Sequence, residues 1–130
     1  MTKIEFSPIG FISTPFEDRA GMPIQPRGAW GVHGKAVLYP AYTECLADLN
    51  GFSHIYLIYV FHKSSGYEAR PIPFLDTQPR GVFSTRAPQR PNAVGLSVVR
   101  LLSVSDNVIE VSDVDMLNQT PLLDIKPYIP

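Results

Sequence analysis

Cysteine is almost absent from this sequence, because Cys45 is the only one. A single cysteine forms no disulfide within the chain and cannot supply the ligand sets of zinc ribbons or zinc fingers. Long hydrophobic runs are missing as well. No apolar stretch reaches the roughly 20 residues that a membrane-spanning helix needs, and the opening segment MTKIEFSPIG contains no apolar signal core. The sequence therefore predicts a cytoplasmic protein with no membrane partner.

Motifs of the common phosphate and metal sites are also missing. There is no GxGxxG sequence and no P-loop, so neither type of phosphate-binding loop is predicted. The three histidines, His33, His54 and His62, show none of the spacings of zinc enzymes. His54 and His62 share one face of a predicted strand but lie roughly 26 Å apart on it. We therefore expect no metal site.

What the sequence does have is a globular composition. Of its 130 residues, 45% are hydrophobic and 11% are aromatic, which excludes general disorder and suits one domain spanning residues 1–130. The 13 prolines are about twice the average usage of roughly 5%, and they are scattered between apolar runs. That distribution indicates many short strands and turns.

Hydrophobic patterning predicts a mainly β fold. Runs rich in β-branched and aromatic residues indicate strands. We place strands at residues 3–13, 35–39, 54–62, 93–104, 107–111 and 113–117. A short extended piece is expected at 70–74 and an extended C-terminal segment at 120–130. The run at 54–62 is continuously apolar, which is typical of a strand buried on both faces. The pattern favours an antiparallel β-barrel or a sandwich.

One helix and one long loop complete the expected fold. Residues 41–51 carry apolar side chains at helical spacing and end at Gly51, so they form the best predicted helix. Residues 13–34 contain four glycines and three prolines. Long loops are uncommon in compact domains and are usually functional, so this N-terminal loop is a candidate part of a site.

Positive charge is concentrated in one region, although the chain as a whole carries a net charge of −1. Residues 78–100 contain Arg80, Arg86, Arg90 and Arg100 and no acidic residue. Arg86 and Arg90 lie in a loop stiffened by prolines, and a rigid loop holds a guanidinium fork against a carboxylate or phosphate at low entropic cost. The pattern indicates anion binding. The alternative is that these arginines pair with the acidic residues of the C-terminal region and only connect two strands.

Two further groups of polar residues lie on predicted strands. Asp124, Lys126 and Tyr128 are two residues apart, so an extended strand presents all three on one face. They form either a reactive cluster or an ordinary surface salt bridge. His62 and Lys63 follow a predicted strand, and strand ends suit functional residues because the sheet fixes their position. A solvated strand end is the alternative for this pair.

Several segments together resemble the motifs of one family. The order and spacing of the TsaA-like (YaeB-like) proteins is matched from Phe6 to Pro130 by the segments SPIGFISTPF, PIQP, GFSHIYLIYVFH, GVFSTRAPQRPNAVGLSVVRL and TPLLDIKPYIP. The characterised members are S-adenosyl-L-methionine-dependent tRNA methyltransferases. They methylate N6 of threonylcarbamoyladenosine, which lies next to the anticodon. The resemblance implies this activity, a tRNA anticodon loop as partner, a β-barrel fold, and a homodimer with cofactor sites near the subunit interface.

The resemblance also implies roles for individual residues. Those expected to bind S-adenosyl-L-methionine are Pro23, Ile24, Gln25, His62, Lys63, Arg86, Leu96, Asp113, Val114 and Asp115. The resemblance places Arg90, Asn92, Lys126 and Tyr128 at the mouth of the active site. The residues expected to contact the RNA are Arg90, Asn92, Arg100 and Lys126; the alternative for Arg100 is a side chain that only extends from its strand to solvent. Methyl transfer to N6 is helped by an acceptor for the N6 proton, and the candidates for this catalytic role are Asp124 first and Tyr128 second.

The chain departs from the family pattern at Asn118-Gln119, where the family usually has Asp-Gly. The change removes a carboxylate and a glycine that tolerates positive φ, so we expect the loop to differ there. Two other functions stay open. One is methyl transfer to another nucleoside or to a small molecule, and the other is a non-catalytic module that binds an adenosyl ligand.

Overall fold

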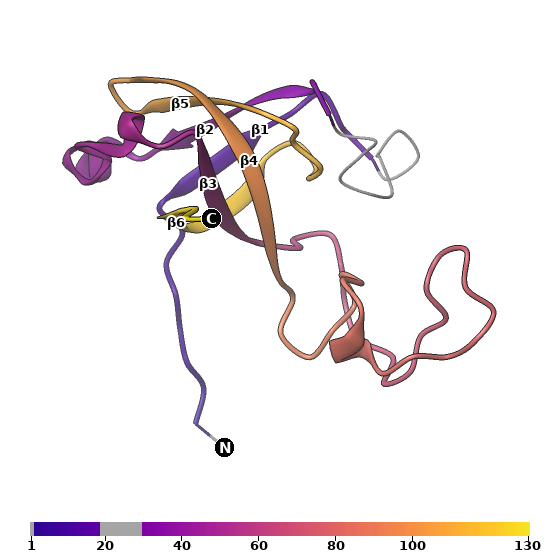
Figure 1. The fold of residues 1–130 in the computed structure, drawn as a ribbon. Helices are drawn as coiled ribbons and strands as arrows, with labels where there is room; N and C mark the ends of the chain where they lie inside the picture. Colours follow the sequence, from indigo (N-terminus) through magenta and orange to yellow (C-terminus); the bar gives the residue numbers. More distant parts are fainter. Residues whose placement is uncertain (1, 19–29) are drawn as a thin grey trace.

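Residues 2–18 and 30–130, which the computed structural model describes, form six β-strands that close into an antiparallel barrel (Figure 1). The strands are β1 (Gly10–Ser13), β2 (His33–Leu38), β3 (His54–Val60), β4 (Val94–Ser105), β5 (Val108–Ser112) and β6 (Thr120–Pro127). Their order around the barrel is β1-β2-β5-β4-β3-β6. The predicted mainly β fold with an antiparallel barrel is confirmed.

The barrel interior is filled by the inward side chains of the strands. Successive residues of a strand point to opposite faces, and on β3 and β4 the inward residues Ile55, Leu57 and Val99 are completely buried. The rest of the core is also largely aliphatic and includes Ile12, Ala36, Leu38, Ile109, Val111, Val114 and Leu122. This packing fixes the positions of β3 and β4, on which the candidate site is built.

The continuous apolar run of β3 predicts burial on both faces, and that prediction is wrong. Ile55, Leu57 and Tyr59 are buried, whereas the alternate residues, such as Tyr56 and Ile58, are half-buried. The reason is the barrel, which encloses only one side of each strand. The apolar outer side of β3 therefore is not explained by core packing.

The helix predicted at 41–51 is a pair of short 3₁₀ helices, η3 (Pro40–Leu46) and η4 (Leu49–Gly51). Asp48 has a φ of 68° and interrupts the pair, and Leu46 is their buried residue. The apolar spacing that predicts an α-helix also suits a three-residue repeat, which explains the error. The predicted end at Gly51 is confirmed.

Two predicted strands are shorter than expected or do not form. The first is limited to β1 instead of residues 3–13, and residues 113–117 form no strand. In the latter segment Asp113 takes a φ of 74°, a left-handed conformation that ends β5. The extended piece predicted at 70–74 belongs to no strand, because its alternating prolines lack the N–H groups that a sheet ladder needs.

Two long connections link the strands. β1 ends at Ser13 and β2 begins at His33, so the predicted N-terminal loop lies between them, and its residues 19–29 lie outside the described part of the chain. Residues 61–93 connect β3 to β4, include the 3₁₀ helix η5 (Val82–Ser84), and extend away from the barrel (Figure 1). Within the described residues, no helix has both the length and the apolar character needed to cross a membrane.

Candidate functional site

A cleft of about 700 Å³ lies between the barrel and the connection formed by residues 61–93. Its lining comes from β3, β4, this connection, the segment 115–117 and Thr120 at the start of β6. These parts are far apart in the sequence. The lining residues that the sequence analysis assigns to a site are His62, Lys63, Arg86, Arg90, Leu96 and Asp115. Phe61, Phe74 and Met116 add apolar wall.

Arg86 and Arg90 shape the loop that carries them. Arg86 donates from Nη2 to the carbonyl oxygen of Leu96 on β4, and Arg90 donates from Nη1 to the carbonyl oxygens of Thr85 (3.0 Å) and Ala87 (3.1 Å). A guanidinium has five N–H donors, so both arginines keep donors for an anion in the cleft. Within the described residues neither forms an ion pair with an acidic residue, so the alternative of C-terminal partners is not realised.

His62 and Lys63 directly follow β3, as the sequence predicts, and both line the cleft. Partial burial lowers the pKa of His62, and the charge of Lys63 lowers it further, so the neutral imidazole predominates at neutral pH. Lys63 donates from Nζ to the carbonyl oxygen of Glu17 at 3.4 Å. This contact joins the cleft wall to the β1–β2 connection.

Three residues form a hydrogen-bonded chain between the barrel interior and the cleft. Tyr59 on β3 and Ser97 on β4 are each 3% exposed, and their hydroxyl oxygens lie 2.7 Å apart. Ser97 Oγ donates to Oδ1 of Asp115 at 2.7 Å. Burial, and then the nearby carboxylate of Asp115, raise the pKa of Tyr59 to about 12. The phenol therefore stays protonated at neutral pH.

No motif in the sequence singles out Tyr59, Ser97 and Gly95 as residues of this site. The two aromatic rings of Tyr59 and Phe61 meet edge to face, with centroids 5.5 Å apart. A Cβ on Gly95 would lie 2.7 Å from Cζ of Tyr59 and 2.8 Å from Cζ of Phe61, so the absence of a side chain leaves room for both rings. The signal lies in the strand alternation, because Gly95 and Ser97 occupy inward positions of β4 where an aliphatic residue is expected.

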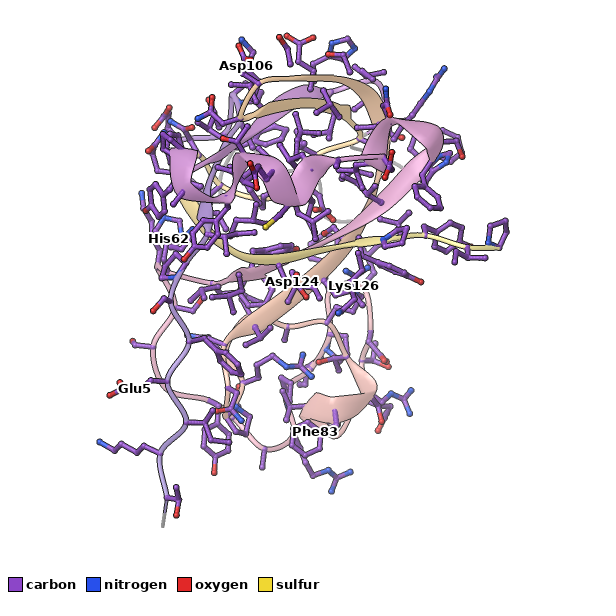
Figure 2. The ribbon with its side chains drawn as sticks, turned by 90° about the vertical axis from the view of Figure 1, so that its left-hand side faces the viewer. Glu5, His62, Phe83, Asp106, Asp124 and Lys126 are labelled. Carbon is purple, nitrogen blue, oxygen red and sulfur yellow. The ribbon has the colours of Figure 1, made fainter. Side chains whose placement is uncertain are left out.

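The C-terminal cluster, formed by Asp124, Lys126 and Tyr128, lies outside the cleft of its own chain. Asp124 and Lys126 pair with residues on the outer side of β3 and thus share a face, as predicted. Their side chains form a salt bridge, with 3.1 Å between Oδ2 of Asp124 and Nζ of Lys126 (Figure 2). The ring of Tyr128 packs edge-on against Tyr56, with centroids 5.4 Å apart. In one chain, the interpretation as a surface salt bridge is therefore the one that the geometry supports.

The remaining residues that the sequence analysis assigns to a site are dispersed. Asp113 accepts a hydrogen bond from the backbone N–H of Gly31 at 2.7 Å, and Val114 is completely buried in the core. Asn92 and Arg100 are exposed. These four residues lie outside the cleft. Outside the described part of the chain lie Pro23, Ile24 and Gln25.

Asn118 and Gln119 stand where the TsaA-like proteins usually have Asp-Gly. Asn118 accepts a hydrogen bond from the N–H of Thr14 at 3.1 Å and donates to Oε1 of Glu17 at 2.9 Å. An aspartate would set two carboxylates against each other at this point, so the amide suits Glu17. Gln119 has a φ of 64°, a conformation that favours glycine.

The groups that line the cleft determine what it can bind. Arginine and lysine side chains and one carboxylate lie beside aromatic and aliphatic walls. Such a cleft can hold a molecule with both charged and apolar parts. In the part of the chain that the structure describes, no three His, Cys, Asp or Glu side chains are grouped so as to hold a metal ion.

Comparison with known proteins points to one family. Residues 11–130 match the family model described as tRNA-methyltransferase O N-terminal domain. A curated relative from Pyrococcus abyssi, named as a probable S-adenosyl-L-methionine-binding protein, is 45% identical over 125 residues, which cover 96% of this chain and 68% of the relative. The tRNA (adenine(37)-N6)-methyltransferase of Mus musculus is 40% identical over 131 residues.

A solved structure has the same fold. The crystal structure of TrmO from Pseudomonas aeruginosa matches 100% of this chain with a TM-score of 0.83 and 37% sequence identity. The match covers only 56% of the length of that structure. The match to the mouse protein covers 94% of this chain but only 30% of the mouse protein. The similarity therefore covers the barrel and leaves a large part of both relatives without a counterpart in this sequence.

Proposed function

Because the chain belongs to the tRNA-methyltransferase O N-terminal domain family, we propose that it is an S-adenosyl-L-methionine-dependent methyltransferase. Its proposed substrate is N6 of threonylcarbamoyladenosine, next to the anticodon of tRNA, and its proposed compartment is the cytoplasm. The observation that carries the proposal is the cleft, which brings together His62, Lys63, Arg86, Leu96 and Asp115. The names of the Pyrococcus and mouse relatives support both the cofactor and the reaction.

The residues of the cleft fit the parts of the cofactor. Arg86 offers a guanidinium to the α-carboxylate, and Asp115 offers a hydrogen-bond acceptor. Phe61, Phe74 and Leu96 offer apolar surface to the adenosyl group. The volume of about 700 Å³ is within the range of roughly 300–1,000 Å³ that is typical of small-molecule sites. S-adenosyl-L-methionine supplies a methyl group activated by its sulfonium. The protein therefore has to bind the cofactor, orient it toward the acceptor and exclude water.

The proposed catalytic residues are Asp124, as acceptor of the N6 proton, and Tyr128 as the second candidate. The N6 nitrogen is a weak nucleophile because its lone pair is delocalised, and removal of its proton assists the attack. Asp124 is salt-bridged to Lys126 on the outer side of β6, away from the cleft of its own chain. These residues therefore act on a cleft only if a second copy of the chain brings them to it.

A homodimer through the outer side of β3, β4 and β6 meets this requirement. On β4, Val94, Leu96, Val98 and Leu102 are all at least 39% exposed. Val94 and Leu96 also line the cleft, so a second copy that covers this side borders the cleft. In a twofold dimer each copy offers the same surface to the other. The outer residues Asp124 and Tyr128 of one copy then lie within the interface.

Four residues are proposed to hold the tRNA: Arg90, Asn92, Arg100 and Lys126. Arg90 lines the cleft, and its contacts with two backbone carbonyls leave further donors for a phosphate. Arg100 is exposed on the same strand as Leu96. Binding through such phosphate contacts weakens as salt concentration rises.

Calorimetric titration with S-adenosyl-L-methionine tests the cofactor step. Arg86→Ala removes a charge-assisted contact and is expected to weaken binding by roughly 10- to 100-fold. Arg70→Ala is the matched control, because Arg70 is an exposed arginine of the same connection outside the cleft. It should bind like the unchanged protein. Equal affinity for the unchanged protein and Arg86→Ala would remove Arg86 from the cofactor site.

Mass spectrometry of tRNA nucleosides tests the acceptor. After incubation with the protein and cofactor, tRNA that carries threonylcarbamoyladenosine should gain one methyl group at N6, whereas tRNA with unmodified adenosine should gain none. Methylation of another nucleoside would replace the proposed acceptor. Cofactor binding without transfer to any RNA would support a binding module, which is the function in the name of the Pyrococcus relative.

A further inference from the structure

Tyr59 and Ser97 place two hydroxyl groups inside the barrel, where packing needs none. Along the same two strands the inward residues Ile55, Leu57 and Val99 are aliphatic and completely buried. Phenylalanine and alanine would fill the two positions without the cost of removing hydroxyl groups from water. The hydroxyls therefore require an explanation beyond the stability of the core.

The hydrogen bonds of this chain of residues have a fixed direction. A carboxylate oxygen only accepts, so the hydroxyl of Ser97 donates to Oδ1 of Asp115, 2.7 Å away. Its single hydrogen is then used, and the phenol of Tyr59 must donate to Ser97 Oγ, also 2.7 Å away. Because the ring of Tyr59 is held by the barrel and by Phe61, the orientation of the Asp115 carboxylate is set from the interior.

Two opposite charges lie at the cleft beside Tyr59. Asp115 and Arg86 both line the cleft. Besides burial, which has the largest effect, the charge of Asp115 raises the pKa of the Tyr59 phenol and that of Arg86 lowers it. Each charge is held by a further bond, Asp115 by Ser97 and Arg86 by the carbonyl oxygen of Leu96. A fixed anion beside a fixed cation is complementary to an amino-acid zwitterion.

We propose that Tyr59 and Ser97 are positioning residues for the amino-acid end of S-adenosyl-L-methionine. They orient Asp115 so that its second carboxylate oxygen accepts the α-ammonium group, while Arg86 holds the α-carboxylate. Such charge-assisted hydrogen bonds depend on angle as well as distance, which makes orientation important. The inference rests on the proposed function and identifies the residues that make the cleft specific for the amino-acid end of the ligand.

Binding of two ligands distinguishes a role of Tyr59 and Ser97 in orienting Asp115 from a role only in the stability of the fold. S-adenosylhomocysteine has the amino-acid end, whereas methylthioadenosine has the same adenosine without it. Calorimetry on the full chain compares Tyr59→Phe and Ser97→Ala with the unchanged protein. Both variants are expected to bind S-adenosylhomocysteine roughly tenfold more weakly and methylthioadenosine with unchanged affinity. The matched controls are Tyr42→Phe and Ser103→Ala, which remove the same hydroxyl groups from exposed positions.

The outcomes distinguish this inference from the function on which it rests. If the unchanged protein binds neither ligand, the proposed function fails. If it binds both ligands, the positioning role fails in two cases: when the variants lose affinity for both ligands equally, and when they lose affinity for neither. An equal loss would mean that Asp115 contacts the ribose or only stabilises the fold. Asp115→Asn keeps the shape of the side chain without its charge and covers the case in which Tyr59→Phe does not fold. It should lose affinity for S-adenosylhomocysteine alone.

Discussion

Gly95 is the residue that lets the aromatic wall of the cleft form. It lies opposite Tyr59 in the pairing of β3 with β4, on the inward side of the barrel. With a side chain at this position, the rings of Tyr59 and Phe61 would have to move. Since Tyr59 also begins the hydrogen-bonded chain to Asp115, this one glycine affects both the core and the cleft.

Gly95→Ala tests this role. The added methyl group is expected to destabilise the protein by about 1–3 kcal/mol, because the buried ring of Tyr59, which is hydrogen-bonded to Ser97, cannot move without strain. Urea unfolding followed by circular dichroism measures the free energy. Gly81→Ala is the matched control, since a Cβ at Gly81 meets no atom within 4 Å, and it should be close to neutral. Equal stability of the two variants would contradict the packing argument.

At the level of single residues, the sequence singles out cleft residues where a motif has an unusual composition. The arginine-rich loop and the strand end at His62 stand out in the sequence, and the structure places both at the cleft. The sequence does not single out Tyr59, Ser97 and Gly95, because an inward serine or tyrosine resembles an ordinary strand residue until its partner across the barrel is known. The hydrogen bond between Ser97 and Asp115 joins residues 18 positions apart, and no local pattern reveals it.

The β3–β4 connection is the element that forms much of the cleft, although it contains little regular secondary structure. Its course depends on local hydrogen bonds, such as those from the backbone N–H of Arg80 to Pro71 and of Val82 to Ala69, both 2.9 Å. At its outer part, Nε of Arg80 lies 2.9 Å from Oδ2 of Asp76. This exposed pair links the acid response of the connection to the charge of Asp76.

The pKa of Asp76 predicts how the connection responds to acid. Hydrogen bonds from Arg80, and then from the backbone N–H groups of Gln78 and Thr77, lower its pKa to about 2 from 3.8. A lowered pKa means that the folded connection favours the carboxylate, so this contribution is complete above pH 3.8 and is lost as the pH falls through about 2. NMR titration of the Asp76 carboxyl carbon measures it. In Arg80→Ala the pKa should rise toward 3.8, whereas Arg70→Ala should leave it unchanged; a value near 3.8 in the unchanged protein would contradict the pairing.

At the level of elements, strands with strong β patterning are predicted correctly. The prediction fails where a turn ends a strand and where the barrel determines which side of a strand is buried. β4 and β5 are recovered because their β-branched runs are bounded by turn residues, and β6 lies within the segment 120–130, which its prolines predict to be extended. The segment 113–117 reads as a strand, yet the positive φ of Asp113 turns it away from the sheet. The double-sided burial expected for β3 fails because the barrel buries only one side of the strand, whereas the residues on its outer side are also apolar or aromatic.

At the scale of the whole molecule, the outer side of the barrel carries apolar residues whose presence core packing does not explain. The apolar residues Leu96 and Val98 on β4 and Ile58 on β3 face outward. Of the candidate catalytic residues, Asp124 pairs with Ile58, and Tyr128 directly follows β6 and bonds to the backbone of His54. The proposed homodimer explains both facts with one contact. Analytical ultracentrifugation should then give twice the chain mass of 14.4 kDa.

Mixed dimers test whether two copies share one active site. At a cofactor concentration just sufficient for the unchanged protein, Arg86→Ala should inactivate the cleft of its own copy, and Asp124→Asn should inactivate the cleft of its partner. Each variant alone then has no active site. When the two are mixed at equal amounts and exchange subunits, half of the dimers are mixed and each has one complete cleft, which restores about one quarter of the original methylation rate. The same pair carrying Val98→Glu in both copies should stay monomeric and show no recovery, because the interface would bury an unpaired charge. If the mixture of dimeric variants also stays inactive, Asp124 does not serve the cleft of a second copy.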